Sequence, residues 1–142
     1  MLNLLTHLEC RYEPRNSILM DGMTEAQEVI FVTKGSVDLG YRYGDKIDYI
    51  LRYTDSVIIG AYSCTFNACH PMFFKSQTVC QGYSIRKREW KSLLVEFSDL
   101  QAQLSQNIKH DFEGMRVKMM KASTKARRVI GQESNDNKGQ EN

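Results

Sequence analysis

A pair of apolar segments joined by one glycine-marked turn constrains the fold of this chain more than any other feature. Residues 28–33 are largely apolar, and the following segment alternates Val37 and Leu39 with Ser36 and Asp38. A period of two is typical of a strand with one face toward the core and one toward solvent. The sequence therefore predicts a β-hairpin across Lys34-Gly35, with Ser36 and Asp38 pointing outward.

More short strands follow, with a turn about every ten residues. We expect them over residues 17–20, 46–53, 57–59, 73–78 and 79–85. A helical turn is predicted within residues 1–10 and a turn over residues 12–17, whereas residues 61–72 show no clear period. Many short strands with regular turns favour a double-stranded jelly roll, here called a β-roll.

The pattern changes to helical spacing from Lys87. The apolar residues 90, 93, 94 and 97 mark one helix, and Ser98 with Gln101 forms a capping box for a second. An apolar stripe then follows steps of three or four residues: Leu100, Leu104, Ile108, Phe112, Met115 and Met119. Such a stripe indicates docking against the roll or against a neighbouring chain.

The sequence thus predicts one α+β domain over residues 1–130. An antiparallel β-roll occupies about 10–86 and the C-terminal helices about 87–128. Residues 131–142 are polar and almost without apolar side chains, so a disordered tail is predicted there.

Charge and hydropathy exclude several classes of protein. The net charge of +2 gives no overall field that would favour nucleic acid. No apolar run reaches the roughly 18 residues of a membrane span, and the first residues lack the pattern of a signal peptide. We therefore expect this piece to be soluble, while a larger, membrane-bound parent protein stays open.

Four cysteines and one histidine raise the alternative of a zinc site. Cys64, Cys69, His70 and Cys80 lie close in sequence, and Cys10 lies apart. Their spacing is loose for a zinc knuckle, and Cys80 falls in a predicted strand. We expect reduced thiols packed as small hydrophobic groups and no metal.

Catalysis and DNA binding find little support in the sequence. A cupin-like enzyme needs two or three converging histidines with a carboxylate, whereas His7, His70 and His110 fall in three different regions. No nucleophile triad or phosphate loop can be argued from spacing. A helix-turn-helix module would have to follow the long helix, and the tail from Gly131 is too short. We therefore predict no catalytic residues and no nucleic-acid partner.

A family resemblance emerges from the order of these motifs. It depends on the hairpin Phe31–Leu39, on Gly60, on the strand Cys80–Arg86 and on the two helices after it. From about Leu8 to Lys121 the chain resembles the cyclic-nucleotide-binding domains of cyclic-nucleotide-gated, hyperpolarisation-activated and related voltage-gated cation channels. The channel-like part is Tyr83-Ser84-Ile85 together with Phe97, which closes the first helix.

The residues expected to hold the nucleotide do not match the family. The family's Gly-Glu pair, whose Glu takes the ribose hydroxyl, reads Gly60-Ala61 here. The Arg and hydroxyl residues that take the cyclic phosphate fall at about His70 and Pro71. Alanine cannot accept a hydrogen bond, neutral imidazole cannot copy the guanidinium fork, and proline has no N–H. The only nearby cation is Lys75, and bulky residues fill the loop: Tyr62, Phe66, Met72 and Phe73.

The resemblance implies a non-catalytic regulatory domain of a cation channel subunit, of the potassium type, with weak or no cyclic-nucleotide binding. It would lie on the cytoplasmic side of a membrane and contact the rest of its subunit and neighbouring subunits in a tetramer. No cofactor is expected. The alternative is a functional cAMP or cGMP sensor. In that case Gly60, Ala61, His70 and Lys75 touch the phosphate and ribose, and Met115 or Met119 covers the base.

A basic segment ends the long helix. Its cations are Arg116, Lys118, Lys121, Lys125, Arg127 and Arg128, with no acidic residue among them. Positive charge at a helix C-terminus is favourable in a solvated helix end. A contact with an anionic lipid headgroup is the other interpretation.

Overall fold

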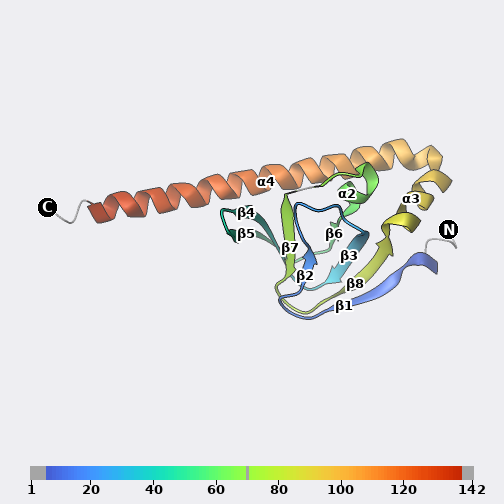
Figure 1. Cartoon of the computed structure of the whole chain (residues 1–142), viewed down its shortest axis with the longest axis horizontal. Coiled ribbons are helices and arrows are strands. Elements are labelled where there is room, and N and C mark those ends of the chain that lie inside the picture. The colour runs from blue at the N-terminus through green and yellow to red at the C-terminus, as the bar shows by residue number, and fades with distance from the viewer. Residues whose placement is uncertain (1–5, 70, 139–142) are drawn as a thin grey trace.

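The computed structural model describes residues 6–69 and 71–138, with side chains up to Lys125. Eight strands form two antiparallel four-stranded sheets, and the long last helix lies along one side of them (Figure 1). The first sheet has the order β1 (Glu9–Glu13), β8 (Cys80–Arg86), β3 (Glu28–Lys34) and β6 (Val57–Ile59). The second has the order β2 (Ile18–Met20), β7 (Met72–Ser76), β4 (Val37–Tyr43) and β5 (Lys46–Tyr53). The predicted α+β roll is confirmed.

Three helices complete the described fold: α2 (Ala61–Phe66), α3 (Lys87–Glu96) and α4 (Ser98–Lys138). Helix α2 lies in the segment that showed no period in the sequence. Helices α3 and α4 separate at Phe97, where the sequence predicted the break, and Ser98 begins α4. All eight strands of the roll therefore precede α3 and α4 in the sequence.

The predicted β-hairpin across Lys34-Gly35 is wrong, because β3 and β4 do not pair with each other: β3 pairs with β6 and β8, and β4 pairs with β5 and β7. The turn at Gly35 instead carries the chain from the first sheet to the second, and both strands contribute to the core. Gly35 turns the chain at a φ of +106°, a conformation that favours glycine, and Val37 and Leu39 are fully buried. Asp38 does not point into solvent as predicted, because it is only 8% exposed. Arg52 on β5 covers it, with Nε 2.8 Å from Oδ1 of Asp38. A buried carboxylate is tolerated where it has such a partner.

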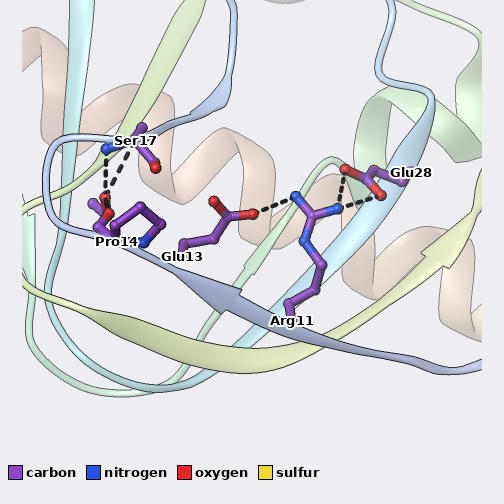
Figure 2. A network of polar contacts seen from close by, with 6 residues as sticks. Arg11, Glu13, Pro14, Ser17 and Glu28 are labelled. Carbon is purple, nitrogen blue, oxygen red and sulfur yellow. Dashed lines mark hydrogen bonds and ion pairs between the residues drawn. The ribbon is translucent and has the colours of Figure 1, made fainter.

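Strand β1 was missed by the sequence analysis, which predicted turns around it. Its residues are charged or exposed, so it has no apolar alternation to recognise. Its side chains are held by charge instead: Arg11 lies between Glu13 and Glu28 of β3, with nitrogen–oxygen distances of 2.8 Å to each (Figure 2). Because β8 lies between β1 and β3, the ion pair between Arg11 and Glu28 spans β8 and links the edge strand β1 to β3.

Helix α4 has 41 residues and extends well past the roll (Figure 1). That length corresponds to about 60 Å. The sequence predicted the helix to end near residue 128 and a disordered tail from Gly131, whereas α4 continues to Lys138. No proline interrupts the backbone hydrogen bonds of this segment.

The apolar stripe of α4 divides into two halves. Ile108, Phe112 and Met115 pack against the core and Met119 is buried within it, so the predicted docking against the roll is confirmed there. The first half remains exposed, with Leu100 at 60% and Leu104 at 39%. Within residues 6–69 and 71–138, no helix has the length and apolar character to cross a membrane.

Two glycine substitutions should have opposite effects on stability. A Cβ at Gly82 of β8 would lie 1.9 Å from the carbonyl oxygen of Phe31, whereas a Cβ at Gly114 of α4 meets open space. Gly82→Ala should lower the free energy of unfolding by about 1–3 kcal/mol, because β3 and β8 must separate. Gly114→Ala should raise it by up to about 1 kcal/mol. Urea denaturation measures both, and equal effects of the two substitutions would contradict the register of β8.

Candidate functional site

A cavity of about 300 Å³ lies between the roll and α4. Strand β5 contributes Tyr53, β7 contributes Met72 and Phe74, and the segment 56–63 supplies β6, the turn at Gly60 and the start of α2. The remaining wall is α4, through Ile108, Asp111, Phe112 and Met115. This volume is at the lower end of the range for small-molecule sites.

Helix α2 is fixed in place by buried contacts. Gly60 precedes it at a φ of +86°, and a Cβ there would lie 2.6 Å from the carbonyl oxygen of Glu28. The Ser63 hydroxyl accepts from the Ala26 N–H at 2.8 Å and donates to the Ala68 carbonyl at 2.6 Å. Trp90 of α3 donates its indole N–H to Thr65 at 3.0 Å. The part of the cavity wall formed by Gly60 and α2 is therefore fixed by contacts with the core of the roll and with α3.

The wall made by α4 rests on an aromatic stack. The rings of Tyr62 and Phe112 are 3.9 Å apart and within 7° of parallel, and Tyr62 also contacts Phe66. Farther along α4, the Ser123 hydroxyl lies 2.7 Å from the Tyr41 hydroxyl of β4. The helix is thus attached to α2 at one point and to the second sheet at another, and it forms one side of the cavity.

The charge of the cavity is negative. Asp111 is the only charged residue among the described side chains that line it. No ion-pair partner of Asp111 occurs among residues 6–69 and 71–125, for which side chains are described. Burial raises the pKa of the Tyr53 phenol, so this group remains a neutral hydroxyl. An anion in the cavity would meet a carboxylate, apolar surface and a few hydroxyl groups, and no cation among the described lining residues.

The structure brings together some of the residues predicted from the sequence. Gly60, Ala61, Tyr62 and Met115 all line the cavity. Met119 is buried in the core instead and does not line it, because it lies one turn farther along α4. His70 lies outside the described residues.

Two predicted site residues lie elsewhere. Lys75 points away from the cavity: its ammonium lies 4.2 Å from the centre of the Tyr49 ring, a cation–π contact over β5. Pro71 precedes β7 and does not line the cavity. Of the four bulky loop residues, Tyr62 and Met72 line the cavity, whereas Phe66 and Phe73 do not.

The sequence analysis missed the part of the site supplied by α4. Ile108 and Phe112 were assigned only to docking, Met115 was assigned to docking or to covering the base of a nucleotide, and Asp111 was not considered. One signal could have found Asp111: it lies three residues after Ile108 and four before Met115, so it shares their helix face.

The cysteines do not form a metal site among the described residues. No group of three or more Cys, His, Asp or Glu side chains converges within them. All four thiols are free, with Cys64 and Cys80 buried and Cys10 and Cys69 exposed. Burial raises the pKa of the Cys64 thiol to about 11, and its Sγ donates to the Ala26 carbonyl. The buried thiols pack as predicted.

Comparisons with known proteins identify the fold. No protein-family model and no curated protein matches the chain. Among solved structures, the Thermus thermophilus catabolite activator protein matches with a TM-score of 0.66 and 12% identity, over 86% of this chain and 57% of that one. PKAR CBD2 bound to Sp-2Cl-cAMPS matches with a TM-score of 0.55 and 18% identity, over 77% and 72%.

A third match is the regulatory subunit of a cAMP-independent protein kinase A from Trypanosoma brucei, with a TM-score of 0.58 and 14% identity. It covers 78% of this chain and 41% of that one, so the chain spans less than half of that subunit. At these identities the likeness shows the fold alone. The β-roll of this chain is that of cyclic-nucleotide-binding domains, as the sequence predicted.

Removing the Phe112 ring should loosen α4. Phe112→Ala deletes the stack with Tyr62, and we expect the free energy of unfolding to fall by about 1–2 kcal/mol. Amide hydrogen exchange should accelerate from Ile108 to Met119 and stay unchanged in β3 and β4. Val117→Ala on the same helix, where the side chain is 42% exposed, is the control. Unchanged exchange in Phe112→Ala would show that the stack does not hold α4.

Thiol labelling should follow burial. At pH 8 iodoacetamide should modify Cys10 and Cys69 readily. Cys64 should react only after unfolding, because a thiol with a pKa near 11 is ionised to only about one part in a thousand at this pH. Cys80, which is also buried, should behave like Cys64. Mass spectrometry with and without urea measures this, and rapid labelling of Cys64 in the folded protein would contradict its placement.

Proposed function

We propose that this chain is a non-catalytic regulatory domain that has the cyclic-nucleotide-binding fold and does not bind cyclic nucleotides tightly. The observation that carries the proposal is the charge of the cavity: its described lining has one charged residue, and this is Asp111. A cyclic phosphate is bound most strongly by a charged donor such as a guanidinium, and the described lining offers a carboxylate and hydroxyl groups in its place.

The free energy of the missing hydrogen bonds to the phosphate and the ribose supports weak binding of cyclic nucleotides. Hydrogen bonds to charged groups contribute about 1.5–3 kcal/mol each. Ala61 cannot replace a carboxylate on the ribose, and Lys75 is directed to Tyr49 instead of the cavity. The loss of two such contacts weakens binding by about a hundredfold to ten-thousandfold. The Trypanosoma brucei match is described as cAMP-independent, so a regulatory role without cAMP is in keeping with this fold.

The parent protein proposed here is a cation channel subunit of the potassium type. The support is the sequence resemblance at Tyr83-Ser84-Ile85 and Phe97. Regulation would be a shift of population between α4 packed on the roll and α4 released from it. The basic end of α4, from Arg116 to Lys125 and beyond, is the proposed contact for an anionic lipid headgroup. Six hydrophobic spans and a pore loop encoded upstream would support this parent, and a soluble partner domain there would argue against it.

A functional nucleotide sensor is the second candidate. It is favoured by one observation, namely that Gly60, Ala61, Tyr62 and Met115 surround a single cavity. In such a sensor, substitution of Ala61→Glu together with His70→Arg should change the affinity for cyclic nucleotides by only a few fold. If the chain instead has the proposed function, the same double substitution should create binding of cyclic nucleotides that the wild-type chain lacks.

Isothermal titration calorimetry with cyclic AMP and cyclic GMP tests the proposal. We expect no saturable heat at millimolar ligand for the wild-type chain, because the cavity has no cation among its described lining residues. The Ala61→Glu/His70→Arg variant should bind more tightly than wild type. A dissociation constant in the low micromolar range for the wild-type chain would overturn the proposal.

A further inference from the structure

We propose that the cavity under α4 is a binding site for aromatic ammonium compounds, that is, for a flat ring that carries a positively charged amine. This inference deepens the proposed function, on which it rests, because it names the ligand class of the same regulatory cavity. It reverses the sign of the charge expected for a ligand of this fold.

The walls of the cavity suit a flat aromatic ring. They are mostly apolar, and the aromatic side chains come from four different elements: Tyr53 of β5, Tyr62 of α2, Phe74 of β7 and Phe112 of α4. Tyr62 and Phe112 are already stacked on each other, so both rings are held at the cavity wall without a ligand. Aromatic faces attract both rings and cations.

Asp111 gives the cavity its preference for positive charge. It lies between the lining residues Ile108 and Met115 on one face of α4, which places its carboxylate at the cavity. The residues three and four positions away are Asn107, Ile108, Gly114 and Met115, none of which is basic.

Among the described side chains, no cation of α4 forms an ion pair with this carboxylate. Arg116 is the next arginine along the helix, and its guanidinium is bonded to Glu113 at 3.0 Å. Asp111 is exposed, so its charge is available to a ligand at the mouth of the cavity.

An ammonium group fits this arrangement better than a neutral or an anionic group. It can pair with Asp111 while its stem and ring contact Tyr62 and Phe112, so that the carboxylate and the aromatic faces act together. A neutral ring keeps only the apolar contacts, and an anion adds repulsion. The cavity volume of about 300 Å³ accommodates a compound with two fused rings.

Three probes with the same ring and different charges test this inference: tryptamine, tryptophol and indole-3-acetate, which are positive, neutral and negative at pH 7. Binding to the whole chain is followed by amide chemical shifts, with the signals of Gly60 and Phe112 reporting occupancy of the cavity. We expect tryptamine to bind about tenfold more tightly than indole-3-acetate, with tryptophol between them.

The variant Asp111→Asn separates charge from shape. It should bring the affinity for tryptamine down to that for tryptophol and leave tryptophol unchanged. Asp45→Asn, the same change of charge in the β4–β5 turn and away from the cavity lining, is the matched control and should behave as wild type.

The outcomes distinguish this inference from the proposed function. Equal affinity for the three probes, or no shift of the Gly60 and Phe112 signals at millimolar tryptamine, would overturn the ammonium site and leave the weak binding of cyclic nucleotides intact. Tight binding of cyclic AMP together with the expected order of the indoles would overturn the proposed function alone.

Discussion

The contact between α2 and α4 determines the character of the site. The stacked rings of Tyr62 and Phe112 hold α4 against the segment that follows Gly60. Because of this contact, the cavity has a wall made by α4, and the charge of that wall is the charge of Asp111. The fold of a cyclic-nucleotide-binding domain is thereby combined with a cavity whose described lining has a carboxylate and no cation.

The two sides of the cavity differ in how firmly they are held. Helix α2 is held by the two hydrogen bonds of Ser63 and by the bond from Trp90 to Thr65. Leaving the buried Ala26 N–H unpaired would cost about 1–3 kcal/mol. Helix α4 is attached mainly through half-buried side chains, with Met119 alone of the described α4 residues buried in the core, and it extends far beyond the roll. The regulatory movement proposed above is therefore a movement of α4 and not of α2.

Periodicity predicted the elements that bury an apolar face. The strands on either side of Gly35, the roll and the break at Phe97 all follow from residues that alternate or repeat at helical spacing. The pairing of those two strands does not follow from it, because β3 and β4 lie in different sheets. Periodicity did not predict the parts of the fold where charges replace apolar contacts: β1 is held by Arg11 and its two carboxylates, and Asp38 is buried under Arg52. It also failed at Lys75 and Asp111, because the direction of a side chain on a strand or helix depends on which neighbours pack against it.

The geometry in solution of Tyr62 and Phe112 tests the central claim most directly. Nuclear Overhauser effects between their ring protons, recorded on the whole chain without ligand, report whether α4 lies on α2. A separation of 3.9 Å between ring centres predicts strong cross-peaks. Absence of these cross-peaks, with both rings assigned, would show that α4 does not form the wall of the cavity and would contradict the account.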